Sequence, residues 1–308
     1  MKVAIAGATG FIGSRLVQML HEQGDAIVVL TRDAKHAWRV FPERAFPNVQ
    51  VVEYVPTDSG NWQQSLSGCN AVVNLAGTAI AAERWTPERK QLIYDSRVHT
   101  TERIVEGIAN AELKPSVLIN ASAIGYYGTS ETATFEEASA PGNDFLASVC
   151  QDWEAAARKV EAACVRLAIV RFGIVLGNGG AIAKLLTPFR LFAGGPLGSG
   201  HQWFSWIHRD DLVRFLIEAI ARPDLSGVFN GTAPNPVRMS ELCDTLGTVL
   251  KRPSWLPVPG FALEMLLGDA AKVVLEGQEV LPRNIEASGF EYRYPQLEPA
   301  LQEIVAQS

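Results

Sequence analysis

Three glycines near the amino terminus have the spacing of a turn that binds a dinucleotide. The segment Gly7–Gly13 reads GATGFIG and stands between an apolar run, Lys2–Ala6, and an amphipathic stretch, Phe11–Gln23. One glycine permits the tight turn, another lets the backbone approach a diphosphate, and the third lets the helix pack on the strand. The free N–H groups of the helix then face the phosphates. The residues expected to contact the dinucleotide here are Gly7, Thr9, Gly10, Phe11, Ile12 and Gly13.

The end of the second apolar run, Ala26–Leu30, indicates which dinucleotide is bound. An NAD site usually places an acidic residue there, whereas an arginine accommodates the 2′-phosphate of NADP. In this sequence Thr31 occupies the acidic position and Arg32 follows it. A guanidinium suits bidentate phosphate binding, and Arg15 could add positive charge. We therefore expect NADP(H), with NAD(H) as the alternative because Asp33 is close by.

Strand-like and helical patterns alternate over the first 170 residues. The apolar runs are Lys2–Ala6, Ala26–Leu30, Val49–Val52, Ala71–Leu75, Val117–Asn120 and Ala168–Phe172, and the helical stretches are Phe11–Gln23, Pro87–Ala109 and Asp144–Glu161. This alternation predicts an α/β fold with a Rossmann-type, doubly wound parallel sheet.

The chain after Phe172 is richer in glycine and proline. Its predicted helices are Ala181–Phe192, Asp211–Ala221 with Asp210 as the N-cap, Ser240–Leu250 and Phe261–Leu275. We expect residues 1–175 to form the NADP-binding domain, with a contribution from 205–232. Residues 176–308 then form a smaller, less regular α/β substrate domain over the carboxyl ends of the strands, where open α/β sheets bind ligands.

Composition excludes several classes of function. The 308 residues are 47% hydrophobic, carry a net charge of −6 and contain no run of basic residues, which argues against nucleic-acid binding. The four cysteines and five histidines form no zinc-ligand spacing, so we expect reduced thiols and no metal. No apolar run reaches the roughly 18 residues of a membrane span, and the first strand starts at Lys2. These features predict a cytoplasmic protein, and they indicate no particular oligomeric state.

Several motifs together resemble the extended short-chain dehydrogenases/reductases. They are Gly7–Gly13, Asn74–Gly77, Ser122, Arg171–Gly177 and Trp206–Leu212. More closely, the chain resembles an atypical subgroup known as epimerase-family proteins, some of which are described as cell-division inhibitors. The C-terminal part of that resemblance comprises Asn230–Pro236, Gly277, Gln278, Pro282, Gly289 and Phe290. The resemblance implies that the cofactor groove is lined by Leu75, Ala76 and Gly77 and closed by Arg171, Gly173 and Ile174.

The catalytic pair of the wider superfamily, Tyr-x-x-x-Lys, is missing. One register places Phe145 and Val149 at the two positions, and the other places Leu146 and Cys150 there. Phenylalanine and leucine have no proton to transfer, so the ordinary acid/base mechanism is absent.

Three residues are the candidate catalytic replacements: Ser122, Tyr126 and Cys150. The resemblance implies that Ser122 holds the reacting oxygen, although a strand-end hydroxyl often bonds to backbone instead. Cys150 can act only if its pKa is lowered, and a core thiol is the commoner case. Arg97 either replaces the positive charge of the lysine or pairs with Asp95 or Glu102 on a helix surface.

Two functions follow from these patterns. The first is an NADP(H)-dependent oxidoreductase or epimerase acting on a nucleotide-sugar-like or other small carbonyl or hydroxyl substrate. The second is a non-catalytic NADP(H)-binding regulatory protein whose working surface contacts a protein partner, for example in cell division. The glycine-rich turn fits both, because the dinucleotide supplies the hydride chemistry and the protein supplies its position.

Overall fold

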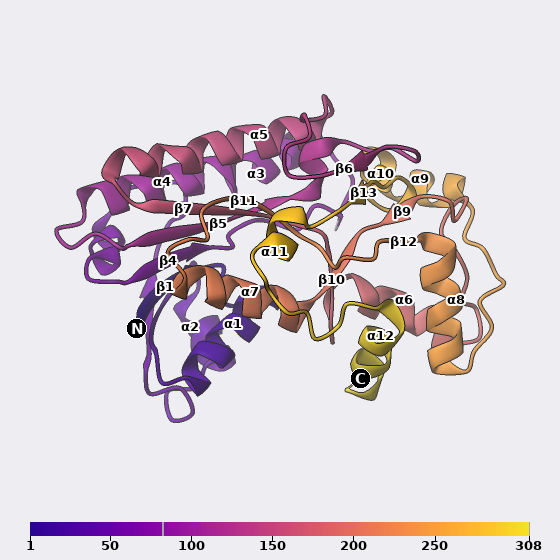
Figure 1. The fold of residues 1–308 in the computed structure, drawn as a ribbon, viewed down its shortest axis with the longest axis horizontal. Coiled ribbons are helices and arrows are strands. Elements are labelled where there is room, and N and C mark those ends of the chain that lie inside the picture. The colour runs from indigo at the N-terminus through magenta and orange to yellow at the C-terminus, as the bar shows by residue number, and fades with distance from the viewer. Residues whose placement is uncertain (82, 308) are drawn as a thin grey trace.

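Seven parallel strands form the central sheet, in the order β11-β7-β5-β4-β1-β2-β3 (Figure 1). This computed structural model describes residues 1–81 and 83–307, apart from the side chains of residues 181 and 184. The strands are β1 (Lys2–Ala6), β2 (Ala26–Thr31), β3 (Val49–Glu53), β4 (Ala71–Asn74), β5 (Val117–Ala123), β7 (Arg166–Phe172) and β11 (Gly227–Gly231). The strand order reverses between β1 and β4, which is where open α/β sheets bind ligands.

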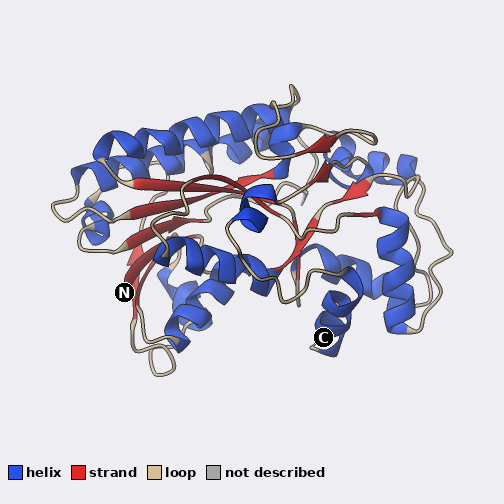
Figure 2. Ribbon diagram, viewed as in Figure 1, coloured by secondary structure: helices blue, strands red, loops and turns tan. Residues whose placement is uncertain are grey.

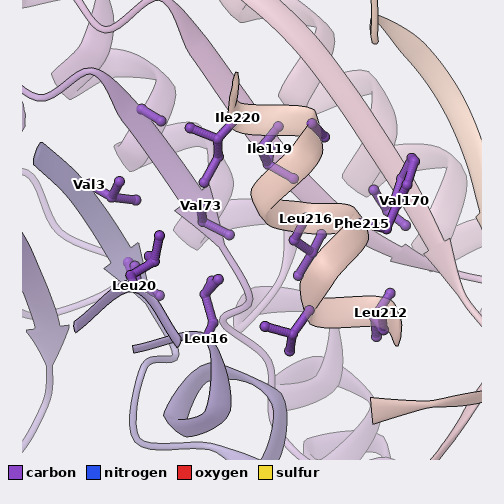
Figure 3. Packing of buried hydrophobic residues seen from close by; sticks show 14 of the residues in the cluster. Val3, Leu16, Leu20, Val73, Ile119, Val170, Leu212, Phe215, Leu216 and Ile220 are labelled. Atoms are coloured by element: carbon purple, nitrogen blue, oxygen red, sulfur yellow. The ribbon is translucent and has the colours of Figure 1, made fainter. Parts of the chain in front are cut away.

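The sheet carries helices on both faces (Figures 1 and 2). One face is covered by α1 (Phe11–Glu22), α2 (Ala34–Val40) and α7 (Arg209–Ala221), and the other by α3 (Pro87–Asp95), α4 (Val98–Asn110) and α5 (Phe145–Arg158). Alternate strand residues supply the two cores, because successive side chains of a strand point to opposite faces. Figure 3 shows Leu16 of α1 and Leu216 of α7 packing with Val73 and Ile119 of the sheet. The expected α/β, Rossmann-type fold is confirmed.

The C-terminal part packs around a third apolar cluster. It contains α6 (Gly180–Arg190), α8 (Met239–Leu250) and α12 (Leu297–Ala306). Strands β9 (Trp203–Phe204) and β12 (Val237–Arg238) pair antiparallel, while β8 (Ile174–Leu176) and β10 (Trp206–His208) pair in parallel. The remaining short elements are β6 (Thr134–Phe135), β13 (Glu279–Val280), α9 (Gly260–Leu267), α10 (Lys272–Leu275), α11 (Arg283–Ala287) and the 3-10 segments η1 (Asn61–Leu66), η2 (Ile124–Tyr127), η3 (Lys159–Ala163) and η4 (Gly268–Ala271). Strand β11 joins the main sheet from within residues 205–232, and the boundary at residue 175 stays a prediction.

Three expected helix limits are wrong for local reasons. The helix expected over Pro87–Ala109 breaks near Ser96, whose hydroxyl donates to the Ile93 carbonyl and accepts the Thr78 N–H, so the side chain competes with the helix backbone. The helix expected over Phe261–Leu275 breaks at Gly268, where φ is +57°. The N-cap of α7 is not Asp210. It is His208, whose Nδ1 accepts the Asp210 N–H at 3.2 Å.

Within the described chain, no helix is long and apolar enough to cross a membrane, and no group of three or more His, Cys, Asp or Glu side chains is arranged to hold a metal ion. All four cysteines are free thiols.

Candidate functional site

The glycine-rich turn brings β1, β4 and α1 into close backbone contact. A Cβ atom on Gly7, whose φ is +77°, would lie 2.6 Å from the Leu75 carbonyl oxygen, and one on Gly13 would lie 2.2 Å from the Gly7 carbonyl oxygen. Gly10 is the N-cap of α1, so no side chain caps this end, and no acidic residue stands in the first turn. The amides at the start of α1 are therefore free to bind an anion, as the dinucleotide diphosphate requires.

The end of β2 presents an arginine rather than a carboxylate. Asp33 is the N-cap of α2, and its carboxylate accepts the His36 N–H at 2.8 Å, a hydrogen bond that holds the Asp33 pKa below its ordinary value. The Thr31 hydroxyl, which is buried, bonds to the Asp33 backbone. Arg32 is exposed beside them. Since Asp33 is engaged at the helix, Arg32 remains the candidate group for a 2′-phosphate, and its contact with a cofactor stays a prediction.

Arg15 does not supply the additional positive charge expected of it at this position. Its guanidinium forms a bidentate pair with Asp210 of α7, at 2.9 and 2.7 Å. The pair fixes α1 against α7, and the charge of Arg15 is balanced there.

The segment that follows β4 is held from below by polar side chains. Asn74 donates to Asn120 and to Thr101, at 2.8 Å each, and accepts the Ala76 N–H at 3.2 Å. These buried bonds fix the course of residues 74–77, which include the expected cofactor residues Leu75, Ala76 and Gly77. Contact of those three residues with a cofactor stays a prediction.

Arg97 lies directly against this segment. A Cβ atom on Gly77 would be 3.3 Å from the Arg97 guanidinium carbon. The guanidinium donates to the carbonyl oxygens of Thr78 (3.0 Å) and Ile93 (3.1 Å) and lies over the Trp153 ring, and no carboxylate of the described chain pairs with it. The expected alternative, a surface pair with Asp95 or Glu102, is therefore wrong. Asp95 contacts His99 instead, and Glu102 contacts Lys159.

Ser122 is part of a buried network rather than a free hydroxyl. Its Oγ donates to the Glu154 carboxylate of α5 at 2.9 Å, and the same carboxylate binds Arg171 at 2.7 and 2.9 Å. Arg171 also donates to the Tyr127 hydroxyl at 2.9 Å, which in turn donates to Asn230 at 2.7 Å. The Ser122 hydroxyl thus bonds to a carboxylate and not to the backbone, and its contact with a substrate oxygen stays a prediction.

Arg171 is committed to this network, which does not support a contact between its guanidinium and the cofactor. Four of its five N–H groups are used, by Glu154 (twice), the Tyr127 hydroxyl and the Glu137 carbonyl. Burial acts to lower the pKa of Arg171, but the hydrogen bonds and charge of Glu154 outweigh it and raise the pKa. Gly173 and Ile174 follow on the same edge of the sheet, and their contact with a cofactor stays a prediction.

Tyr126 is the one candidate catalytic residue with an unused polar group. It is half-buried in η2, and its ring centre lies 3.4 Å from the Arg171 guanidinium carbon. Its neighbour Tyr127 is buried, which raises the pKa of Tyr127 to about 12. Among the hydrogen bonds of the described residues, none involves the Tyr126 hydroxyl, whereas that of Tyr127 is bound on both sides.

The structure gives no support to acid/base chemistry at Cys150. The residue is 5% exposed, and burial, together with the charge of Glu154, raises its pKa to about 11. Its sulfur lies 3.8 Å from the Ala123 carbonyl oxygen. A thiol in this environment keeps its proton at neutral pH and packs as a small apolar residue.

Thiol labelling tests this placement. At pH 8 the native protein should react with an aromatic disulfide at one cysteine, the exposed Cys164, and at all four after unfolding. A pKa of about 11 leaves about 0.1% of Cys150 as thiolate at that pH. Rapid labelling of Cys150 in native Cys164→Ser protein would contradict this result and restore an activated thiol.

The positions of the missing Tyr and Lys are occupied by apolar side chains that pack against their neighbours. Phe145 contacts the Trp85 ring edge-on at 5.4 Å between centres, and Val149 is buried. An ammonium is nevertheless near: Lys90 of α3 lies 5.5 Å from the Phe145 ring centre and 3.3 Å from Asp269. Sequence reasoning missed Lys90 and Glu154. The signal for Glu154 was its spacing, because it stands four residues after Cys150 on one helix and therefore on the same face.

Comparison with family models decides the affiliation. The model described as the NAD dependent epimerase/dehydratase family matches residues 3–230, which is more than half of the chain. The chain belongs to this family. A second model, described as a domain of unknown function (DUF1731), matches residues 258–304 of this family member. The expected resemblance is confirmed.

Named relatives of this epimerase/dehydratase-family protein cover almost its whole length. A chloroplastic SDR39U1 homolog of Arabidopsis thaliana is 52% identical over 99% of this chain and 87% of its own. YfhF of Bacillus subtilis, also named an epimerase family protein, is 38% identical over 99% and 98%. The crystal structure of human SDR39U1 with NADPH matches at a TM-score of 0.88 and 35% identity, covering 100% of both chains.

Proposed function

We propose that this protein is an NADPH-dependent oxidoreductase that reduces a carbonyl group of a small molecule without the usual Tyr-x-x-x-Lys pair. The glycine-rich turn Gly7–Gly13 fits the cofactor. The start of α1 has no capping side chain, and the tight packing at Gly7 leaves no room for a side chain there, so backbone amides are available to bind a diphosphate. Arg32 favours NADPH over NADH, and the similarity to human SDR39U1, crystallised with NADPH, supports the same choice. Bound NADPH supplies a hydride to the carbonyl carbon.

The observation that carries this proposal is the unneutralised charge of Arg97. Arg97 is half-buried, and a guanidinium withdrawn from water is usually paired with a carboxylate, because taking a lone charge out of water is costly. Arg97 has only carbonyl, hydroxyl and aromatic partners, and burial lowers its pKa below the ordinary value. It lies beside Gly77, and its charge reaches Cys150, one of the two positions that correspond to the superfamily lysine. It thus supplies positive charge from a different element.

This arrangement assigns a role to each group. The oxygen of the substrate gains negative charge as the hydride arrives at the adjacent carbon, and the field of Arg97 stabilises that charge. The oxygen then takes a proton from the Tyr126 hydroxyl, which regains it from water. The carbonyl compound, NADPH and one proton from solvent would thus give the alcohol and NADP⁺, so charge and atoms balance. The Ser122–Glu154–Arg171 network packs against the Tyr126 ring through the Arg171 guanidinium and so positions Tyr126.

Single-turnover reduction tests the proposal. NADPH-loaded protein is mixed with a panel of carbonyl compounds and nucleotide sugars, and nicotinamide absorbance is followed. Arg97→Met should slow hydride transfer about 100- to 1,000-fold, the usual cost of losing one oxyanion-stabilising group, while the NADPH affinity changes less than about threefold. Arg97→Lys should restore part of the rate.

The matched control is Arg103→Ala on the same helix, because Arg103 pairs with Glu106 at the surface. If Arg103→Ala and Arg97→Met reduce the best substrate equally fast, the role of Arg97 is refuted.

The second candidate function is an NADP(H)-binding regulatory protein that contacts a protein partner. It is favoured by the state of two expected catalytic groups, since the Ser122 hydroxyl is taken by Glu154 and the Cys150 thiol is held protonated. Under this function the protein binds NADPH and reduces nothing in the panel. A division phenotype in the source cells would then depend on Arg32 and remain unchanged in Arg97→Met and Tyr126→Phe variants.

A further inference from the structure

Arg209, the first residue of α7, lies against Phe11 of the glycine-rich turn Gly7–Gly13. Its guanidinium carbon is 4.9 Å from the centre of the Phe11 ring, and Phe11 is the first residue of α1. The side chain is 18% exposed. The packing of α7 on α1 thus brings this arginine against the ring of the residue that begins α1, the helix whose first amides are expected to bind a diphosphate.

A second glycine-rich segment closes on the same ring. Cβ atoms placed on Gly177, Gly179 and Gly180 would each lie within 3.0–3.1 Å of the Phe11 ring, and the one on Gly177 would be 3.1 Å from Cβ of Arg209. This segment opens α6, whose N-cap is Gly179. Neither α6 nor α1 has a capping side chain or an acidic residue in its first turn. The positive ends of two helices therefore meet at Phe11, next to Arg209.

The positive charge of Arg209 is incompletely balanced. The neighbouring carboxylate, Asp210, gives both oxygens to Arg15, and the Arg209 Nε is 3.9 Å from Asp210, beyond hydrogen-bond distance. That Nε is buried and has no hydrogen-bond partner in the described part of the chain. Burial also lowers the pKa of Arg209. A cation whose charge is only partly matched, and whose side chain keeps 18% of its surface exposed, favours an anionic ligand at that exposed part.

We infer that Arg209 binds the diphosphate of the dinucleotide together with the amides at the start of α1. The inference rests on the NADPH binding of the proposed function and adds a residue from the second half of the chain. The diphosphate is favoured over the 2′-phosphate because Arg209 contacts the first residue of α1, where the backbone amides face the diphosphate. The 2′-phosphate belongs instead near Arg32, after β2.

Binding measurements with two nucleotides separate these roles. NADPH and NADH are titrated by nicotinamide fluorescence, and displacement of NADPH by inorganic pyrophosphate is followed. Arg209→Ala should weaken both nucleotides by the same factor, about 10- to 100-fold, since both carry the diphosphate. Pyrophosphate should displace NADPH less effectively from this variant. Arg32→Ala should weaken NADPH alone.

Arg222→Ala is the matched control, because Arg222 ends the same helix and pairs with Glu218 and Asp224 at the surface. It should bind both nucleotides like the wild type. Arg209→Lys and Arg209→Gln preserve side-chain bulk, and their NADPH and NADH affinities are compared with those of the wild type if Arg209→Ala does not fold. Unchanged affinities in the Arg209 variants overturn the inference, and so does a loss confined to NADPH. If the wild-type protein binds neither nucleotide, both the proposed function and the inference on Arg209 fail.

Discussion

Gly13→Ala is expected to weaken cofactor binding strongly and to destabilise the fold. The added Cβ would lie 2.2 Å from the Gly7 carbonyl oxygen and 2.7 Å from Cα of Ala8, and both are backbone atoms that no rotamer change can move aside. The start of α1 must therefore shift away from β1. Loss of two hydrogen bonds to the charged diphosphate, at about 1.5 kcal/mol each, corresponds to a fall in NADPH affinity of about 100-fold. The overpacking should also lower the free energy of unfolding by about 3 kcal/mol.

Fluorescence titration and urea unfolding measure the two effects. Gly260→Ala is the control, because the same added atom at the start of α9 would meet Leu275 at 3.7 Å and Cα of Gly198 at 3.9 Å, which are ordinary contacts. The control should bind NADPH normally. A Gly13→Ala protein with wild-type affinity would show that the helix amides do not hold the diphosphate.

The sheet could be predicted from the sequence because its signals are local. Buried parallel strands read as continuous apolar runs, and five of the seven strands do so, while a sixth, the edge strand β3, has three valines around Gln50. The seventh, β11, reads Gly-Val-Phe-Asn-Gly and has too few apolar residues to stand out. It becomes a strand because β7 offers a free edge and Phe229 packs against Phe215. The dinucleotide-binding signature is equally local, because it is contained in the seven consecutive residues Gly7–Gly13.

The catalytic candidates could not be placed from the sequence because their partners lie far along the chain. Whether Ser122 is free depends on Glu154, and whether Arg171 can reach a cofactor depends on Glu154 and Tyr127. No spacing rule connects these residues, since they come from a strand end, a helix and a 3-10 turn. Arg209 was missed for the same reason, because its contact with Phe11 exists only after α7 packs on α1.

Arg171→Met should be the most destabilising change in the buried network. It leaves the Glu154 carboxylate, which is 3% exposed, with only the Ser122 hydroxyl and Arg158 at 3.7 Å. Removing one partner of a buried ion pair costs about 3–5 kcal/mol, because the remaining charge is neither paired nor hydrated. Urea unfolding should show a loss of this size, whereas Arg283→Met, which breaks an exposed pair with Glu136, should change stability by less than about 1 kcal/mol.

The double variant Glu154→Leu/Arg171→Met distinguishes charge from packing as the cause of that loss. With both charges removed, no carboxylate is left unpaired, so the double variant should be more stable than Arg171→Met alone by about 2 kcal/mol or more. A double variant as unstable as the single one would mean that the guanidinium mainly supports Tyr126 and Tyr127 through its flat face. A third outcome is that the double variant regains stability but not carbonyl reduction. The network would then have two separate roles: the fold would need only a filled core, whereas catalysis would need the Arg171 guanidinium against the Tyr126 ring.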